Sequence, residues 1–437
     1  MSDKAKRNLG TAGIIALCLS NLCYMSDLIM LPGYAAIFGH FKDSPTAVTD
    51  FIASGSQLTL IVGSLLAPIF MRYFSKRSII LVGFAIFTIQ ASCTGLVDSA
   101  EYVAVMRGIT GFFMGLIMPV ALALIIEWYS DDEVKRNKYT GWFDGCLAGM
   151  GAVLMILGGI LLTTGWQNMF LGYLLGIPIW IMLFFTIPWT APEGKRDYKA
   201  KHEEAKKAGQ NVGDGKMNWR TFIMIFLAFS VCNMFYGCLV YKFSIYLAEN
   251  FMWLPPWVNG VLGAAKGIIG AIMGIFVFAA LFKRAGRFTI TICFAAQAIA
   301  FLGLYFVFPG IGGVLWFLLC YAFIGVAFGL AIPYYHSYGA VVFPPSKMPL
   351  VASMISVAFA FGAFVSSYFV TWLQEALNLA TYTACLPYIG IGCVAATILT
   401  IIIGLADPNR KKLKAQAKMS AEEEAMEKVE EVDSAFE

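Results

Sequence analysis

Ionisable side chains inside long apolar stretches are the residues of this sequence best placed to do chemistry. Asp27, Arg107, Asp144, Lys242 and Lys266 each lie in such a stretch. A charge near the centre of a bilayer costs about 2.5 kcal/mol or far more, so such a residue is kept where it faces a wet cavity or a partner. We therefore expect ion or substrate chemistry at these positions.

Asp27 and Arg107 are the strongest candidates, and with Asp144 we assign them to proton coupling. Asp27 in a pocket of low dielectric could take up and release a proton near neutral pH, whereas Arg107 keeps its charge in any pocket. Arg107 could hold an anionic group of a substrate or pair with an acid. The alternative for both is a static ion pair that locks helices together. At helical spacing Asp27 shares its face with Ser20, Cys23, Tyr24, Leu31 and Tyr34, which suit a cavity wall.

The two lysines have different surroundings. Lys266 has small residues at helical spacing, such as Gly263 and Gly270, which leave room for a neighbouring helix or for the lysine to enter a cavity. The alternative is that Lys266, about two turns from the outer end of its span, reaches toward the membrane surface. Lys242 lies closer to the end of its span, where reaching toward the membrane surface is favoured. Asp144 lies near the start of its span, which favours a supporting or gating role over substrate contact.

Aromatic residues could complete a substrate site, and for most of them ordinary helix packing is the alternative. His336 follows Pro333 in the segment "IPYYHSY", where a bent backbone could line a cavity. The predicted substrate-binding residues are Tyr24, Arg107, Trp142, Tyr236, Lys266, Tyr334, Tyr335 and His336.

The elements that position these residues are membrane-spanning helices. Of the 437 residues, 59% are hydrophobic and 13% charged, whereas soluble domains average about 45–50% apolar and about 25% charged residues. About 20 apolar residues cross a bilayer as a helix. The sequence thus predicts an all-α membrane protein, with bends at Pro32, Pro119 and Pro333. The twelve expected spans are 11–37, 51–71, 78–97, 102–128, 138–163, 167–190, 221–247, 257–282, 288–308, 312–343, 348–374 and 379–405.

Charge placement predicts the topology. Nearly all of the 31 Lys and Arg residues fall in segments that twelve spans place on one side, and only Lys42 lies in the loops of the other side. Because basic residues favour the cytoplasmic side, we predict a multi-pass protein of the plasma or bacterial inner membrane with both termini in the cytoplasm. The net charge of +4 then reports topology and implies no nucleic-acid partner.

The chain divides into two similar halves. We expect a six-helix bundle over 1–190, a cytoplasmic linker over 191–220, a second bundle over 221–406 and a charged cytoplasmic tail over 407–437. The pattern Gly-x-x-x-Gly-Leu-x-x-Pro occurs at Gly111 and again at Gly325. Two pseudo-symmetric bundles around a central cavity are the geometry of alternating access, in which the halves rock about a shared site.

Several of these segments resemble motifs of the major facilitator superfamily. "VMRGITGFFMGLIMP" resembles the family's fourth-helix motif, with Arg107 as the motif arginine. "GCLAGMGAVLMILGGILLTTGWQNMF" is similar to the glycine-rich fifth-helix pattern, which in drug–proton antiporters is associated with export, although the strict Gly-Pro pair is missing. "CYMSDLIMLPGYAAI" is similar to the acidic first-helix motif of that branch, with Asp27 and Pro32 in register.

The loop after the second span departs from the family pattern. In "PIFMRYFSKR" the usual acid is replaced by Arg72, and only the basic end remains. This puts in doubt a gating mechanism that needs that carboxylate. The residues assigned to motifs and conformational change are Lys76, Arg77, Gly111, Gly115, Gly151 and Arg287.

The resemblance implies a secondary transporter that works by alternating access and is coupled to an ion, in our prediction the proton. Bases among the cavity candidates match or outnumber acids, which favours an amphipathic or aromatic organic anion as substrate. The motif resemblance favours multidrug efflux by drug–proton antiport instead. We expect a monomer without cofactor or metal.

An intramembrane enzyme and a non-transporting receptor are remote alternatives. The three histidines are far apart in the chain, and no H-E-x-x-H, G-x-S-x-G or Walker sequence occurs. A sizeable soluble module, such as a receptor usually couples to, is also missing.

Overall fold

The computed structural model describes residues 10–129, 133–189, 192, 218–343 and 348–405. Throughout these ranges the regular structure is helical, which confirms the predicted all-α class. The α-helices are α1 (Thr11–Leu19), α2 (Asn21–Tyr24), α3 (Tyr34–His40), α4 (Thr46–Tyr73), α5 (Lys76–Ser92), α6 (Ala100–Trp128), α7 (Glu133–Leu162), α8 (Gly176–Thr186), α10 (Trp219–Val240), α11 (Phe243–Asn250), α12 (Pro256–Ile272), α13 (Phe278–Ala285), α14 (Thr289–Leu304), α15 (Gly310–Val342), α16 (Met348–Leu377) and α17 (Leu386–Leu405).

Every expected span coincides with helical structure. Within the described ranges ten helical segments are long and apolar enough to cross a membrane, and a bent pair over Thr11–Tyr24 and Ser26–His40 makes an eleventh. The one remaining expected span, 138–163, corresponds to α7, which has 30 residues and is apolar over Gly149–Leu162. Large apolar side chains remain exposed along these helices, for example Phe185 at 80% and Ile311 at 72%. Lipid contact explains this exposure, because soluble surfaces rarely carry such extensive apolar area.

The first span is broken just before Asp27. Its two parts meet at 59° around Met25, and the backbone then continues as 3-10 turns over Ser26–Ile29 and Leu31–Gly33. Irregular backbone at membrane depth is tolerated where protein buries it and side chains satisfy its polar groups. Tyr173 does so here, because its hydroxyl donates to the Ser26 carbonyl at 2.9 Å.

The break therefore precedes Pro32, where the bend was expected. The other two expected bend points, Pro119 and Pro333, lie inside the uninterrupted helices α6 and α15.

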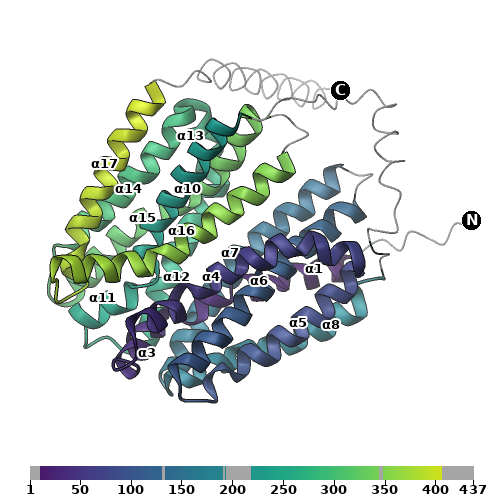
Figure 1. Cartoon of the computed structure of the whole chain (residues 1–437), viewed down its shortest axis with the longest axis horizontal. Coiled ribbons are helices and arrows are strands. Elements are labelled where there is room, and N and C mark those ends of the chain that lie inside the picture. The colour runs from purple at the N-terminus through teal and green to yellow at the C-terminus, as the bar shows by residue number, and fades with distance from the viewer. Residues whose placement is uncertain (1–9, 130–132, 190–191, 193–217, 344–347, 406–437) are drawn as a thin grey trace, which may run out of the picture.

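The helices form two groups that lie side by side. In Figure 1 the purple-to-blue helices up to α8 lie together, as do the teal-to-yellow helices from α10 onward. The groups meet where α7 packs on α12 and α4 packs on α16. We call the end of the molecule that carries the turns 41–45, 96–99, 163–165, 251–255, 305–309 and 378–382 the outer end, because the lysine distribution predicts that it faces away from the cytoplasm.

The repeated glycines pack the fourth span of the first half against its second span. A Cβ atom on Gly111 would collide with the backbone carbonyl of Ser56, and one on Gly115 with that of Leu60. Only glycine permits this approach of α6 to α4, as at the small-residue interfaces of other membrane helices.

The second copy of the pattern does the same work in the second half. A Cβ atom on Gly325 would meet the backbone carbonyl of Lys266, and one on Gly329 that of Gly270. Here α15 takes the place of α6, and α12 the place of α4. The sequence repeat is therefore also a repeat of packing.

Candidate functional site

Asp27 and Arg107 form a buried ion pair. Arg107 Nη2 lies 2.7 Å from Asp27 Oδ1. Asp27 is 4% exposed and Arg107 is 1% exposed. The other carboxylate oxygen accepts hydrogen bonds from Ser56 Oγ at 2.7 Å and from Gln57 Nε2 at 2.6 Å. Two residues that lie far apart in the sequence are thus brought together, and α4 supplies the polar side chains around them.

Backbone and hydroxyl groups of α4 also hold the Arg107 guanidinium. Its Nε donates to the Ile52 carbonyl at 3.0 Å and its Nη2 to Ser56 Oγ at 3.0 Å. The Nη1 atom and the Gln57 Oε1 atom are buried without a hydrogen-bond partner. Removing one member of a buried pair costs about 3–5 kcal/mol, because the other charge is left uncompensated. Neutralising Asp27 with a proton therefore leaves Arg107 in need of another anion.

Lys266 is a buried lysine with an aromatic environment. It is 3% exposed, and its Nζ donates to the Tyr236 hydroxyl at 2.8 Å. The Nζ atom lies 5.0 Å from the centroid of the Tyr236 ring and 6.0 Å from that of Phe328, and these two rings stack on each other at 4.9 Å. Within the described part of the chain no carboxylate pairs with this lysine. Rings stabilise a cation only in part, so the site favours an incoming anion.

A row of rings extends from this lysine toward the inner end of the second half. Phe328 is 6.5 Å from Phe359, Phe359 is 6.2 Å from Phe229, and Phe229 is 4.2 Å from Tyr335, measured between centroids. The Tyr335 hydroxyl is buried without a hydrogen-bond partner. The row thus joins two predicted substrate residues, Tyr236 and Tyr335, along one aromatic surface.

The two polar sites occupy equivalent places in the two halves. The carbonyls of Ser56 and Lys266 face the first glycine of each repeat. The Ser56 side chain donates to Asp27 on the first span, and the Lys266 side chain donates to Tyr236 on the seventh. In both halves, a donor on the second helix thus binds an acceptor on the first.

The same equivalence holds for the fourth helix of each half. Arg107 and Tyr321 each precede their repeated glycine by one helical turn. The Tyr321 hydroxyl is buried without a hydrogen-bond partner. The first half therefore carries a neutralised ion pair at this place, whereas the second carries Lys266 and the Tyr321 and Tyr335 hydroxyl groups, which have no hydrogen-bond partner among the described residues.

A second ion pair joins the two halves near the outer end. Lys242 Nζ lies 2.9 Å from Asp50 Oδ1, and the residues are 5% and 2% exposed. The lysine also lies over the Phe38 ring, 4.6 Å from its centroid. Lys242 therefore points into the protein instead of toward the membrane surface, which corrects the sequence-based interpretation. Asp50 escaped prediction because it falls one residue before the expected span 51–71.

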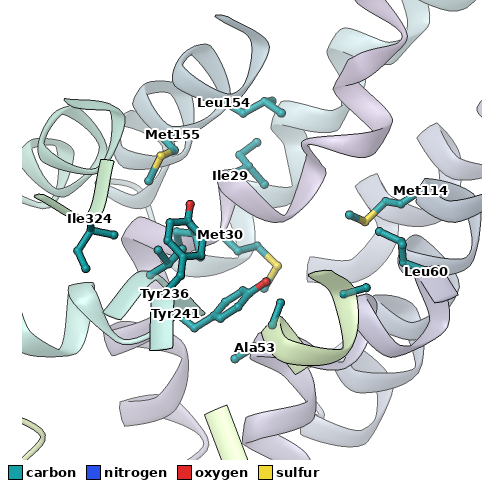
Figure 2. Packing of buried hydrophobic residues seen from close by; sticks show 14 of the residues in the cluster. Ile29, Met30, Ala53, Leu60, Met114, Leu154, Met155, Tyr236, Tyr241 and Ile324 are labelled. Atoms are coloured by element: carbon teal, nitrogen blue, oxygen red, sulfur yellow. The ribbon is translucent and has the colours of Figure 1, made fainter. Parts of the chain in front are cut away.

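Further contacts close the outer end. At one of them a Cβ atom on Gly159 or Gly260 would collide with the backbone of the opposite half. Figure 2 shows buried apolar residues of both halves near one another, among them Met30 on the first span and Tyr236 and Tyr241 on the seventh. Hydrogen bonds across the halves are Ala35 N to Ser244 Oγ at 3.1 Å, Ser54 Oγ to the Phe364 carbonyl at 2.9 Å, Tyr368 hydroxyl to the Ala47 carbonyl at 3.2 Å, and Asn259 Nδ2 to the Pro32 carbonyl at 3.3 Å.

The remaining predicted substrate residues are spread over the molecule. Tyr24 is half-buried. Trp142 is 44% exposed and touches Tyr139 edge-on at 5.5 Å near the inner end of α7. Tyr334 is buried and stacks on Tyr338 at 5.7 Å.

Two further candidates have side chains outside the described part of the structure. Asp144 lies on α7 and His336 on α15, so their predicted roles stay predictions.

The motif residues tie helices together at the inner ends of both halves. Lys76 Nζ lies 2.6 Å from Glu127 Oε2 at the end of α6, so this lysine finds its carboxylate on the fourth span. Arg77 Nη2 donates to the Phe184 carbonyl at 2.9 Å. In the second half Arg287 Nη1 donates to the Tyr338 hydroxyl at 3.2 Å.

The last motif glycine, Gly151, allows α7 to approach the broken first span. A Cβ atom there would meet the Leu28 side chain.

The family model of the Major Facilitator Superfamily matches residues 14–367. The chain belongs to this superfamily, and it is an integral, multi-pass membrane protein. The superfamily and the solved structures of this fold are transporters rather than enzymes.

Curated relatives match over part of the chain. The tetracenomycin C resistance and export protein of Streptomyces glaucescens is 30% identical over 125 residues, which is 28% of this chain and 23% of that protein. The multidrug transporter MdfA of Yersinia pestis (strain Angola) is 28% identical over 178 residues, which is 38% of this chain and 41% of that protein. The chain thus spans between 23% and 41% of the length of these relatives.

Solved structures match over nearly the whole chain. A point mutant of the nucleoside transporter NupG has a TM-score of 0.71 at 13% identity and covers 90% of this chain and 99% of its own. The inward-open xylose transporter XylE from E. coli has a TM-score of 0.66 at 16% identity and covers 88% of this chain and 94% of its own. At these identities the likeness shows the fold alone.

Proposed function

We propose that this protein is a proton-coupled secondary transporter that moves a small amphipathic or aromatic organic anion by alternating access. One observation carries the proposal: an Asp27–Arg107 ion pair lies in one half, and a buried lysine, Lys266, for which the described residues provide no carboxylate partner, lies in the other. Among the solved neighbours, one is described as a D-xylose–proton symporter, which is compatible with proton coupling on this fold.

The coupling follows from competition for Arg107. A proton that binds the Asp27 carboxylate neutralises it and frees the guanidinium, which then attracts an anionic substrate group. Proton and anion thus favour each other's binding, and this reciprocity is the thermodynamic requirement for cotransport. Lys266 and the aromatic row from Tyr236 to Tyr335 bind the anion and its apolar body from the second half.

The topology and the halves complete the proposal. The groups 1–190 and 221–406 rock against each other, the segment 191–220 links them, and the tail 407–437 follows the last span. Both termini lie in the cytoplasm, and the protein acts as a monomer.

The test uses purified protein in proteoliposomes with an imposed pH gradient. Benzoate and benzylammonium serve as probes of similar shape and opposite charge. We expect benzoate uptake driven by the gradient, and a loss of about tenfold or more in the Asp27→Asn variant. Exchange of labelled for unlabelled benzoate without a gradient persists in that variant.

The matched control is Asp98→Asn, which removes a carboxylate with 61% side-chain exposure at the outer end. It leaves gradient-driven uptake unchanged. If Asp27→Asn behaves like this control, Asp27 has no part in coupling.

Multidrug efflux by drug–proton antiport is the second candidate. The two curated relatives described above favour it, because one is a resistance and export protein and the other a multidrug transporter. A cationic drug would compete with the proton for Asp27, so benzylammonium and larger lipophilic cations would move against protons. The Lys266→Gln variant separates the two functions. Selective loss of benzoate transport favours the organic anion, whereas unchanged transport of both probes removes Lys266 from the substrate site.

A further inference from the structure

A pocket of about 240 Å³ opens at the outer end between the two halves. Its wall includes Phe38 and Phe41 from the first half and Lys242 from the second. The Asp50–Lys242 pair forms part of it, so the pocket lies at the place where the halves must separate. It is distinct from the buried sites around Asp27 and Lys266, whose side chains do not line it.

The charges of this pocket favour an anion. Asp50 is neutralised by Lys242 at 2.9 Å, and the second lysine in the wall, Lys42, is exposed. Within the described ranges no carboxylate pairs with Lys42. One positive charge is therefore left over in the pocket wall.

The start of α4 adds to this positive potential. Thr46 and Thr49 of its first turn line the pocket. The N-cap residue is Pro45, so no side chain caps the helix, and the first turn contains no acid. The backbone N–H groups at such a helix start carry partial positive charge and favour anions.

The rest of the wall suits a single aromatic ring. Phe38 and Phe41 offer apolar surface, and Lys242 lies over the Phe38 ring at 4.6 Å. The volume of about 240 Å³ is below the range of roughly 300–1,000 Å³ that drug-sized ligands occupy. A one-ring solute fits this size, whereas a large lipophilic drug does not.

We propose that this pocket is an outer subsite for a small aromatic carboxylate, with the carboxylate between Lys42 and Lys242 and the ring against Phe38 and Phe41. That this carboxylate is the transported solute rests on the proposed function. An anion bound here competes with Asp50 for Lys242 and so weakens the ion pair that joins the halves. The subsite thus links arrival of the solute at the outer end to opening of that end.

The test compares Lys42→Gln with Lys42→Arg and Asp43→Asn. Lys42 is exposed, so its replacement leaves the fold intact. Benzoate binding to the purified protein is measured by calorimetry, and benzoate KM is measured separately from each side of oriented proteoliposomes. In Lys42→Gln we expect binding at this subsite to weaken about fivefold. The KM should rise by a similar factor from the outer side only, and Lys42→Arg should restore both.

Asp43→Asn is the matched control, because Asp43 is exposed beside Lys42 but does not line the pocket. It leaves binding and KM unchanged. If Asp43→Asn strengthens benzoate binding as much as Lys42→Gln weakens it, general surface charge is the cause and the subsite is overturned. A change in KM from both sides in Lys42→Gln, or no binding of benzoate to the unchanged protein, would also overturn it. If benzoate binds in a Lys42-dependent way but is not transported, the subsite stands and the proposed function fails.

Discussion

The backbone carbonyls of Ser56 and Lys266 occupy the same position in the two halves, each against the first glycine of the repeated pattern. Their side chains differ, and so do the groups they bind: a carboxylate on the first span and a phenol on the seventh. The two halves thus share the same helix packing, but the side chains at this position differ. They form an ion-pair site in the first half and a lysine site in the second. We infer that the proton site at Asp27 belongs to the first half alone, whereas Arg107 and Lys266 bring a basic side chain from each half to the anion.

The glycine packing predicts a contrast between two substitutions that look alike in sequence. Gly111→Ala places a Cβ atom on the Ser56 carbonyl, which cannot move without shifting α4. We expect a loss of about 1–3 kcal/mol in unfolding free energy, seen as a lower melting temperature of the detergent-solubilised protein. Gly267→Ala meets nothing within 4 Å and leaves the melting temperature unchanged or slightly higher. Equal effects would contradict the role of the close approach.

The contact between Gly159 and Gly260 predicts a variant that opens the outer end. In Gly260→Val the side chain collides with the Met155 carbonyl and with Gly159, so the closed arrangement is destabilised. The reporter is a cysteine at Ser54, which is fully buried in the closed state. We expect faster labelling by a membrane-impermeant maleimide, corrected for the native cysteines. Gly267→Val on the same helix serves as control, and similar labelling in both variants would refute the prediction.

The Asp50–Lys242 pair predicts a charge-swap rescue. Asp50→Asn or Lys242→Gln leaves one buried charge unpaired, which costs about 3–5 kcal/mol. Each single variant should lower the melting temperature and speed labelling at Ser54→Cys. The double variant Asp50→Lys with Lys242→Asp restores the attraction, and we expect it to recover part of both effects. A double variant no better than the singles would show that the pair does not hold the halves together.

The aromatic environment of Lys266 predicts an order of effects on anion transport. Tyr236→Phe keeps the ring stacked on Phe328 and removes only the hydroxyl group. We expect its benzoate KM to change by less than about threefold, whereas Lys266→Gln loses about tenfold or more in kcat/KM. If Tyr236→Phe is as harmful as Lys266→Gln, the hydroxyl group is the substrate contact instead of the cation.

The helices could be predicted from sequence because lipid imposes a length and an apolar composition on each span. That Asp27 and Arg107 need a buried partner or a wet cavity also followed, because a charge in an apolar stretch is costly. Their pairing stayed one of several alternatives, since helix order does not say which faces meet. The structure resolves this through α4, whose Ser56 and Gln57 bind the same carboxylate.

Features that depend on contacts between distant helices could not be predicted. Asp50 looks like an ordinary acid at the edge of a span until Lys242 from the other half is placed beside it. The break at Met25 has no proline at its centre, and the expected bend residue Pro32 lies further along, in the second of the 3-10 turns that follow the break. Asp50 depends on Lys242, and the break is stabilised by Tyr173, which binds the Ser26 carbonyl. Both partners are far away in the sequence, so neither feature could be read from its own segment.

The two ion pairs differ in which helices they join. The Asp27–Arg107 pair lies wholly within the first half, whereas the Asp50–Lys242 pair spans both. In the proposed mechanism a proton therefore binds and leaves Asp27 while the Asp50–Lys242 pair stays intact. Loss of Asp27 alone should leave a protein that still opens and closes but lets its solute run downhill, so a single substitution separates an energy-driven pump from a passive carrier.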